Sequence, residues 1–343
     1  MKPMNTYFVI LAGGKGERLW PLSRNDKPKQ LLPFLDNQSL LEQTISRIQK
    51  ISIKQNIWII TTEEQLPQIN VLVGNQVGKI IAEPTSKNTA PALLLASLMI
   101  EANDPQAMIV FLPADHYILD NDDFCNTVAH AVTISQAQQA ITLIGVTPQG
   151  PATGYGYIEY NQSLNNMNGI IQFHEKPDLE TAQKYYKTPG MLWNIGIFCA
   201  QSNTFIAQCK THAIDIYNRV TAYIHTGNKQ EYELITATSI DYAVIEKSKN
   251  LYVVIGTFKW SDVGNLDTFL SLQRQNVSLN TTVALNSDNN ILNVKNKLVA
   301  LINVNNICII ETDDVLLIVP RAEVEQVKVL LQHIKNNKLE QYL

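Results

Sequence analysis

The chain has 343 residues, of which 45% are hydrophobic and 17% are charged, and its formal net charge at pH 7 is −4. This length suffices for one large α/β domain and a smaller second module. The acidic balance argues against a nucleic-acid-binding protein, because such proteins present a basic face. The 4 cysteines are scattered without a C-x-x-C pair, which argues against a zinc site or a disulfide framework.

The N-terminus carries a single lysine and a short apolar run that is too brief for a signal peptide. No segment approaches the ~20 consecutive apolar residues of a membrane span. We therefore expect a soluble, cytoplasmic protein that keeps its thiols reduced and has no membrane partner.

The first half of the chain alternates between buried-strand patterns and amphipathic helix patterns. That order predicts a Rossmann-like, doubly wound and mostly parallel α/β sheet, covered by helices on both faces, with ligands at the carboxyl ends of its strands. A Ser39–Glu42 capping box and Pro91 at a first helical turn mark two helix starts. The expected strands cover residues 7–11, 56–62, 79–82, 108–112 and 141–146, and the expected helices cover residues 39–50, 91–102 and 124–139.

The pattern changes in the second half of the chain. From about Asn276 onward, short apolar runs alternate with Asn- and Asp-rich turns, as in the coils of a small β-structure, and a helix over residues 321–336 closes it. We therefore expect a large domain over residues 1–275 and a separate module over residues 276–343. Between them the sequence predicts strands over residues 153–160, 169–174 and 251–256, and helices over residues 178–187, 202–212 and 239–247.

The most informative segment follows the first expected strand. Gly13, Gly14 and Gly16 remove side chains from a turn, so that backbone N–H groups can approach a polyphosphate closely. Pro21 and Pro28 favour an ordered loop over a helix. Cations follow the turn along this loop: Lys15, Arg18, Lys27 and Lys29. The segment therefore predicts a site for a triphosphate and its leaving group; a plain glycine turn would not account for the cations.

Two other phosphate motifs are excluded at this loop. The dinucleotide fingerprint requires a third glycine and an acidic residue at a second strand end, and both are missing here. The P-loop requires Ser or Thr after Gly-Lys, but Gly16 follows Gly14-Lys15.

Two aspartates follow expected strands. Asp115 comes after strand 108–112, and Asp262 lies in a Trp-Ser-Asp-Val-Gly turn after strand 251–256. Magnesium is commonly held by one or two carboxylates plus substrate phosphates, so the two aspartates predict a metal pair. The alternative is that each aspartate caps a following helix. His116, beside Asp115, is more typical of an orienting hydrogen-bonding group than of a general base.

A carboxylate and an amine meet at another expected strand end. Glu175 and Lys176, fixed by Pro177, can bind a sugar hydroxyl and a phosphate; the alternative is an exposed strand end. Asn194 and the glycines around Gly154 offer an amide and bare backbone, which polyol recognition commonly uses. Each of these signals is weak by itself.

Taken in order, these motifs resemble those of the sugar-nucleotide pyrophosphorylase family of nucleotidylyltransferases. The resemblance implies transfer of GMP from GTP to mannose 1-phosphate, giving GDP-mannose and pyrophosphate, with Mg²⁺ as cofactor. It covers nearly the whole chain, through Leu11–Leu22, Pro28–Gln30, Asn88–Ala92, Pro113–His116, Thr153–Gly156, Glu175–Pro177, Trp193–Gly196, Asp241–Ala243 and Trp260–Gly264.

The resemblance also implies roles for single residues. Arg18, Lys29, Asp115 and Asp262 would be catalytic, and the two aspartates would bind Mg²⁺. The sugar phosphate would be bound by Gly154, Glu175, Lys176 and Asn194. The nucleotide would be bound by Ala12, Gly13, Gly14, Gly16, Arg18, Lys29, Glu83, Asn88, Thr89 and Ala90.

The implied chemistry agrees with the residues present. A phosphate monoester with a second pKa of about 6 is largely ionised at pH 7, so its attack on the α-phosphorus requires no general base. Lys27 and Lys87 stand where the family usually has arginine, and His174 stands where valine is commoner. Arginine can bind phosphate through two parallel hydrogen bonds and lysine cannot, which leaves open a change in nucleotide affinity or preference.

The C-terminal module resembles the short left-handed β-helix of compact relatives, which implies a homodimer. The chain stops before the phosphomannose isomerase barrel of many bacterial relatives, so we expect a monofunctional enzyme. Two alternatives stay open: the same chemistry on another hexose 1-phosphate or nucleotide, and a non-catalytic paralogue that binds sugar nucleotides and regulates an active partner. Such a paralogue would be expected to lose a loop cation or a metal aspartate.

Overall fold

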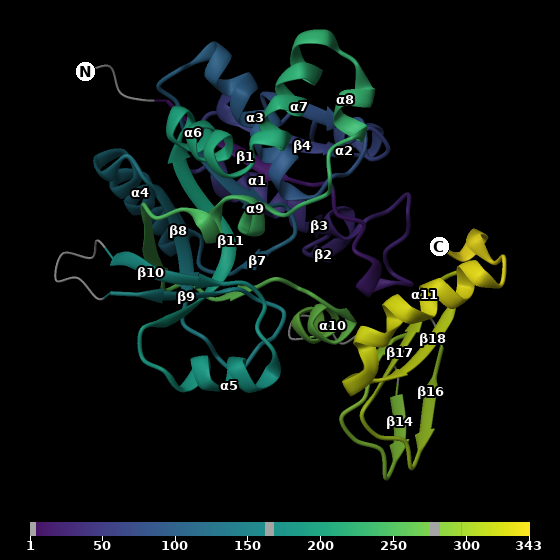
Figure 1. Cartoon of the computed structure of the whole chain (residues 1–343). Coiled ribbons are helices and arrows are strands. Elements are labelled where there is room, and N and C mark those ends of the chain that lie inside the picture. The colour runs from purple at the N-terminus through teal and green to yellow at the C-terminus, as the bar shows by residue number, and fades with distance from the viewer. Residues whose placement is uncertain (1–4, 162–167, 275–281, 296) are drawn as a thin grey trace. The chain divides into compact units, whose positions relative to one another are not determined.

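The computed structural model describes residues 5–161, 168–274, 282–295 and 297–343 (Figure 1). The chain divides into two compact units. The first comprises residues up to Gly13 with 45–114 and 118–260, and the second comprises 14–44, 115–117 and 261–343. The predicted boundary between residues 275 and 276 lies outside the described residues.

The first unit is built on a 9-stranded sheet with the order β5-β4-β1-β6-β11-β8-β12-β10-β9. Its first half is parallel, since β1 pairs with β4 and β6, and β4 pairs with β5. The long strand β11 then pairs antiparallel with β6 and β8, whereas β8 and β12 are parallel. The strands are β1 (Thr6–Leu11), β4 (Ile57–Thr62), β5 (Lys79–Glu83), β6 (Met108–Pro113), β8 (Ile141–Val146), β9 (Tyr157–Tyr160), β10 (Asn168–His174), β11 (Met191–Gln201) and β12 (Leu251–Gly256).

Helices cover this sheet, so the predicted doubly wound α/β architecture is confirmed (Figure 1). The helix α4 packs on β8, β11 and β12, while α3 packs against α6 and α7. Buried leucines fill α3 on several sides, which is why it lies within the core. The helices are α2 (Leu66–Val73), α3 (Thr89–Asn103), α4 (Asn121–Gln138), α5 (Leu179–Lys187), α6 (Ser202–His212), α7 (Ile214–Thr226), α8 (Lys229–Glu233) and α9 (Ile240–Ala243).

The second unit joins the glycine-rich loop to the C-terminal module. The loop forms two 3₁₀ turns, η1 (Glu17–Leu19) and η2 (Lys29–Leu31), instead of a helix, as the prolines predicted. The module pairs β14 with β16 and β15 with β17 in parallel, and β17 with β18 antiparallel. Its elements are α10 (Leu266–Arg274), β14 (Thr282–Leu285), β15 (Ile291–Asn293), β16 (Val299–Ile302), β17 (Ile307–Glu311), β18 (Leu316–Pro320), η5 (Arg321–Gln326), α11 (Val327–Asn336) and η6 (Glu340–Tyr342).

One apolar core holds this second unit together. Leu19 and Trp20 of the loop are buried with Phe269 of α10 and with Val327 and Leu331 of α11. The predicted helix over residues 321–336 is a 3₁₀ segment, η5, followed by α11. Shorter elements complete the chain: η3 (Lys54–Asn56), β2 (Pro33–Leu35), β3 (Gln38–Ser39), α1 (Leu40–Ile48), β7 (Tyr117–Ile118), β13 (Trp260–Ser261) and η4 (Ile245–Lys247).

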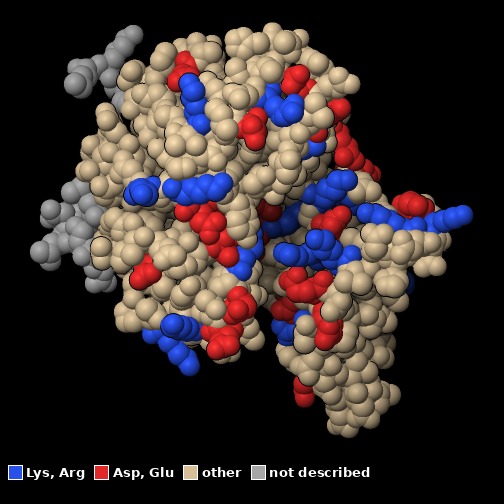
Figure 2. All heavy atoms as spheres, in the orientation of Figure 1, with Lys and Arg blue, Asp and Glu red and all other residues tan. Residues whose placement is uncertain are grey.

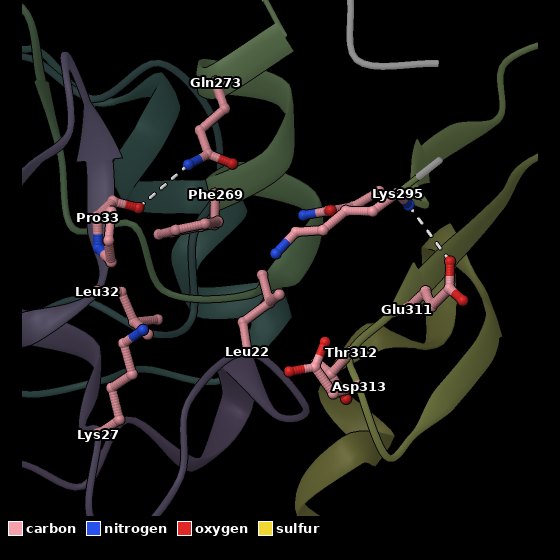
Figure 3. Close-up of a pocket in the computed structure, with 11 residues that line it drawn as sticks. Leu22, Lys27, Leu32, Pro33, Phe269, Gln273, Lys295, Glu311, Thr312 and Asp313 are labelled. Carbon is pink, nitrogen blue, oxygen red and sulfur yellow. Dashed lines mark hydrogen bonds between the residues drawn. The ribbon is translucent and has the colours of Figure 1, made fainter. Parts of the chain in front are cut away.

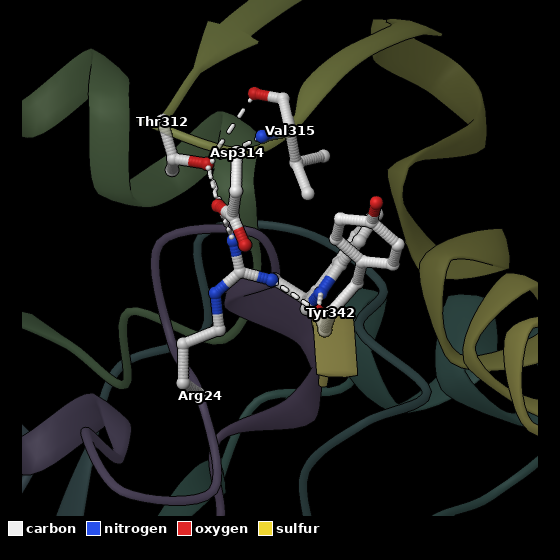
Figure 4. Close-up of polar contacts among 6 residues, drawn as sticks. Arg24, Thr312, Asp314, Val315 and Tyr342 are labelled. Carbon is white, nitrogen blue, oxygen red and sulfur yellow. Dashed lines mark hydrogen bonds and ion pairs between the residues drawn. The ribbon is translucent and has the colours of Figure 1, made fainter. Parts of the chain in front are cut away.

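Polar contacts reinforce that core (Figure 4). The Arg24 guanidinium donates to Asp314 Oδ1 at 2.7 Å, to Thr312 Oγ1 at 3.1 Å and to the carbonyl oxygen of Tyr342. Trp20 Nε1 donates to the same carbonyl oxygen at 2.7 Å. The loop is therefore fixed to the C-terminal module by side chains from the stretch between its two 3₁₀ turns.

In the ranges that the structure describes, no helix is both long enough and apolar enough to cross a membrane.

Candidate active site

The glycine turn is shaped by close backbone approach. Gly16 has φ +67°, and a Cβ on it would lie 2.3 Å from Lys29 Cβ, so only glycine fits there. A Cβ on Gly14 would meet no atom within 4 Å, so the space beside the Gly14 backbone is open. In the first unit, Gly13 lies beside Glu83, whose Oε1 would be 3.8 Å from a Cβ on Gly13. Ala12, the residue before it, is buried and donates its N–H to Ile60.

Lys29 contacts both aspartates of the predicted metal pair, all within the second unit. Its side chain is 9% exposed, and Nζ lies 2.8 Å from Asp115 Oδ2. Nζ also donates to the backbone carbonyl oxygen of Asp262 at 2.5 Å. Burial by itself would raise the pKa of Asp115, but Lys29 and then His116 outweigh it, so the pKa lies below its usual range. The fold thus brings together Lys29, Asp115 and the Asp262 turn, which the sequence places far apart.

The oxygens around Lys29 suit a divalent cation. The Asp115 carboxylate and the Asp262 turn already converge on one ammonium group, and carboxylate and carbonyl oxygens are the ligands that Mg²⁺ prefers. A Cβ on Gly264 would lie 2.7 Å from Asp262 Oδ2, so the turn packs its backbone against that carboxylate. Within the described ranges no cluster of three or more His, Cys, Asp or Glu side chains forms, so phosphate or water oxygens would complete the coordination.

Arg18 lies at the edge of the same unit. Its Nε is 3.0 Å from Glu325 Oε2, and the two side chains are 54% and 57% exposed. Asn265 Nδ2 also donates to Glu325, at 3.0 Å. Exposed ion pairs contribute only about 0–1 kcal/mol, so a phosphate group can take the place of Glu325 at low cost.

Glu83 ends β5 in the first unit and is 4% exposed. Tyr232 of α8 donates its hydroxyl to Glu83 Oε2 at 2.6 Å. Burial raises the pKa of Glu83 to about 7, and the Tyr232 hydrogen bond offsets part of that rise. Sequence reasoning missed Tyr232 because nothing in its local pattern indicates that α8 packs beside β5.

This buried carboxyl predicts a pH-dependent stability. The folded pKa of about 7 exceeds the ordinary value of 4.5, so the folded state holds a proton that the unfolded state releases. Stability should therefore fall as pH rises from 4.5 to about 7, by roughly 2–3 kcal/mol. Glu83→Gln keeps an acceptor for Tyr232 but cannot titrate, so its unfolding free energy should change less with pH.

Urea unfolding at several pH values between 5 and 8 measures this slope. Glu101→Gln, on α3, is the matched control and should keep the slope of the unmodified protein. If the unfolding free energy of Glu83→Gln changed with pH as steeply as that of the unmodified protein, Glu83 would not be the group responsible for the slope.

The segment at the start of α3 is tied to a later part of the chain. Asn88 has φ +69° and caps the helix, accepting from Thr89 N at 2.8 Å. Ile240 N donates to Thr89 Oγ1 at 2.8 Å, and Ala90 N donates to the Thr238 carbonyl oxygen at 3.1 Å. Lys87, one of the predicted departures from arginine, donates to the backbone carbonyl of Glu233. These contacts hold the predicted nucleoside-binding segment rigidly.

Three of the four predicted sugar-phosphate-binding residues lie around Asp241: Glu175 and Lys176 follow β10, and Asn194 lies on β11. The side chain of Glu175 is 4% exposed and pairs with Lys176 Nζ at 2.6 Å. Asn194 Nδ2 donates to Asp241 Oδ1 at 3.1 Å. Gly156, rather than the predicted Gly154, approaches this group: a Cβ on it would lie 2.9 Å from Glu175 Oε2, whereas a Cβ on Gly154 would meet nothing within 4 Å. Asp241 belongs to the Asp241–Ala243 motif, and the sequence by itself predicts no role for it.

The second unit also contains a cavity of about 320 Å³ (Figure 3). Phe269 and Leu32 give it an apolar wall, and Lys27 and Lys295 line it together with Glu311. Lys27, which stands where the family usually has arginine, therefore lines this cavity.

Comparisons with known proteins agree with these observations. Residues 7–278 match the nucleotidyl transferase family, and residues 280–334 match the MannoseP isomerase/GMP-like β-helix domain. A mannose-1-phosphate guanylyltransferase of Escherichia coli is 32% identical, covering 95% of this chain and 75% of that protein. One of Salmonella montevideo is 33% identical, covering 95% of this chain and 73% of that protein.

A solved structure supports the same relationship. The crystal structure named "mannose-1-phosphate geranyltransferase", from Thermus thermophilus, superposes with a TM-score of 0.87 at 27% identity and covers 97% of this chain and 100% of that chain. The family predicted from the motifs is thereby confirmed. The chain belongs to the nucleotidyl transferase family, in the group that contains these mannose-1-phosphate guanylyltransferases, and it carries their C-terminal β-helix domain.

Proposed function

We propose that this nucleotidyltransferase transfers GMP from GTP to mannose 1-phosphate, giving GDP-mannose and pyrophosphate. The observation that carries the proposal is the convergence of Lys29, Asp115 and the Asp262 turn, beside a glycine loop that presents backbone to open space. The names of the related proteins support the choice of nucleotide and sugar.

The reaction is a substitution at the α-phosphorus of GTP. A phosphate oxygen of mannose 1-phosphate forms a bond to that phosphorus, and the bond to the bridging oxygen of the β-phosphate breaks, so that pyrophosphate leaves with the electron pair. The attacking phosphate is already ionised at neutral pH, so no side chain has to remove a proton. Catalysis then depends on positioning and on neutralising negative charge.

We assign the neutralisation to the second unit. Lys29 and Arg18 would balance charge on the phosphates, and the N–H groups at Gly14 and Gly16 would donate to phosphate oxygens. Asp115 and Asp262 would hold Mg²⁺, which would supply further positive charge to the triphosphate when bound.

We assign recognition of the substrates to the first unit. The nucleoside would be bound by Ala12, Gly13, Glu83, Asn88, Thr89 and Ala90. The sugar phosphate would be bound by Gly154, Glu175, Lys176 and Asn194, with the Lys176 ammonium on the phosphate and the Glu175 carboxylate on a hydroxyl.

Pyrophosphate release tests the proposal directly. The protein is incubated with each nucleoside triphosphate and each hexose 1-phosphate, with Mg²⁺ and after chelation with EDTA. We expect turnover with GTP and mannose 1-phosphate, and its loss on chelation. A preference for UTP or dTTP would support the alternative of the same chemistry on another pair, and no turnover with any pair would support a non-catalytic, sugar-nucleotide-binding regulator.

We also propose that the enzyme works in the cytoplasm, without a nucleic-acid or membrane partner. All of its cysteines are buried free thiols, as reducing conditions favour. The formal net charge of −4 gives nucleic acid no general attraction.

We propose further that the C-terminal module binds a second copy of the chain. Leu285 of β14 and Ile302 of β16 are register partners, so they stand side by side on one face of the sheet, and they are 58% and 66% exposed. Figure 2 shows an almost uncharged surface over the part of the module around β14 and β16. Exposed apolar patches of this kind commonly mark protein interfaces, and an uncharged patch suits a self-complementary contact between identical chains.

A charge on this face should therefore prevent dimerisation. We expect light scattering to give a dimer for the unmodified protein and a folded monomer for Ile302→Glu, with a melting temperature that no longer depends on protein concentration. Val329→Glu, on an exposed position of α11, is the control and should remain dimeric. A monomeric unmodified protein at micromolar concentration would contradict the prediction.

A further inference from the structure

Asp241 is held firmly beside a predicted sugar-binding residue. It lies on α9, which Ser239 caps by accepting from Tyr242 N at 3.4 Å. The neighbouring Ile240 is buried and donates its N–H to Thr89 Oγ1 at 2.8 Å, so the start of α9 is anchored to the start of α3. The Asp241 carboxylate is therefore fixed by the fold and can in turn orient what it contacts.

Its contact is the side-chain amide of Asn194. Asn194 Nδ2 donates to Asp241 Oδ1 at 3.1 Å, while Asn194 Oδ1 accepts from Gly196 N at 3.1 Å. Gly196 has φ +69°, a conformation that glycine adopts without strain. The backbone of Asn194 is fixed as well, because its N–H donates to the Gly156 carbonyl oxygen at 2.8 Å.

These contacts leave a defined pair of groups on Asn194. An asparagine amide has two N–H donors and two acceptor lone pairs. Asp241 takes one donor and Gly196 takes one lone pair, so the side-chain hydrogen bonds among the described residues leave one N–H and one lone pair for a ligand. A rotation of the amide by 180° would exchange these groups, and it would turn the amide oxygen toward the Asp241 carboxylate.

The charge on Asp241 prevents that rotation. Burial, and then the Glu175 carboxylate, raise the pKa of Asp241 to about 6, while Lys176 and the Asn194 hydrogen bond lower it. At neutral pH the group is mostly ionised and can only accept hydrogen bonds. Two carboxylates, the Lys176 ammonium and the oriented Asn194 amide thus lie close enough to interact with one another in the first unit.

We propose that Asp241 is a positioning residue for the hexose: by fixing the orientation of the Asn194 amide, it determines which arrangement of hydroxyl groups the site accepts. This inference rests on the proposed function, since it assumes that Asn194 contacts the sugar. A hydroxyl of one configuration meets the free N–H or lone pair of Asn194, and its epimer directs that hydroxyl elsewhere. A site built to hydrogen-bond a hydroxyl discriminates strongly when the hydroxyl is misplaced.

The test separates substrate binding from turnover. Kinetics with mannose 1-phosphate and its epimer glucose 1-phosphate are measured for Asp241→Ala and Asp241→Asn at saturating GTP. Asp241→Ala should raise KM for mannose 1-phosphate about tenfold, leave kcat nearly unchanged and reduce the preference for mannose, as expected when one charge-assisted hydrogen bond is lost. Asp241→Asn can turn its carbonyl oxygen to Asn194, so it should recover most of the affinity and the preference.

A double-mutant cycle identifies the route of the effect. In an Asn194→Ala background, Asp241→Ala should add nothing, because Asp241 acts through Asn194. Asp215→Ala, on the exposed start of α7, is the control acidic residue and should match the unmodified protein. An unchanged KM in Asp241→Ala, or a further loss in the Asn194→Ala background, would overturn the inference.

A folding test and a binding measurement distinguish failure of this inference from failure of the proposed reaction. Failure of both Asp241→Ala and Asp241→Ser to fold would assign Asp241 a folding role and would also overturn the inference. Calorimetric binding of mannose 1-phosphate requires no turnover, so weaker binding in Asp241→Ala supports the inference even if pyrophosphate release shows that the proposed reaction is wrong. If the unmodified protein does not bind mannose 1-phosphate, the inference fails together with the sugar assignment.

Discussion

Replacing Lys29 with glutamine should lower kcat for GDP-mannose formation by about 10²–10³-fold, the usual effect of removing one group that stabilises developing charge. The Lys29 side chain is buried, and Nζ contacts both Asp115 and the Asp262 turn, so glutamine in its place removes the positive charge from both contacts. Steady-state measurement of pyrophosphate release gives the effect.

A lysine outside the loop provides the control. Lys295 lines the 320 Å³ cavity of the same unit, so Lys295→Gln should keep its kcat. A Lys29→Gln variant that keeps more than half of the native kcat would contradict the role assigned to Lys29.

Lys29→Gln should also lower the free energy of unfolding, by an amount that depends on pH. The lowered pKa of Asp115 stabilises the fold above the unfolded pKa, and this contribution is lost as pH falls through the folded pKa. Lys29→Gln should therefore cost stability at neutral pH and less in acid. Since the Asp115 side chain is 35% exposed, water compensates in part, and the loss should be about 1 kcal/mol.

Asp262→Asn should also lower kcat by about 10²–10³-fold while leaving the melting temperature nearly unchanged. Asparagine has almost the same shape, and the backbone carbonyl that accepts from Lys29 is retained. The lost charge weakens the proposed Mg²⁺ site, so the Mg²⁺ concentration for half-maximal rate should rise. Direct Mn²⁺ binding, followed by electron paramagnetic resonance, gives a readout that does not depend on turnover.

Asp313→Asn is the matched control for this variant. Asp313 is an exposed aspartate on the cavity of the same unit, and its replacement should leave both kcat and Mn²⁺ binding unchanged. Near-normal activity of Asp262→Asn would remove Asp262 from the metal site.

Much of the large sheet could be predicted from the sequence. The five strands expected in the first half agree with β1, β4, β5, β6 and β8 to within a residue at each end. Strands buried on both faces are continuous apolar runs, and such runs are easily recognised. The strand β11 was missed because Asn194 and Gly196 interrupt its apolar pattern, and α7 and α10 were not predicted either.

The candidate site was predictable where its residues follow strands or glycine turns. The loop, Asp115 and Glu175 carry that local signal. Tyr232 and Asp241 do not, because each acts through a partner far away in sequence: Tyr232 is 149 residues from Glu83, and Asp241 is 47 residues from Asn194. Packing of helices on the sheet creates those contacts, and no local pattern encodes them.

The bond between Trp20 and Tyr342 has a consequence for how the enzyme becomes active in a cell. These residues are 322 positions apart, and Arg24 binds the same carbonyl oxygen. At the usual ~5–20 residues per second, the ribosome needs tens of seconds to reach Tyr342 after it has made Trp20. Until then, the loop that we propose to hold the triphosphate lacks its anchor, so a nascent chain cannot bind GTP in its final geometry before synthesis reaches the C-terminal module.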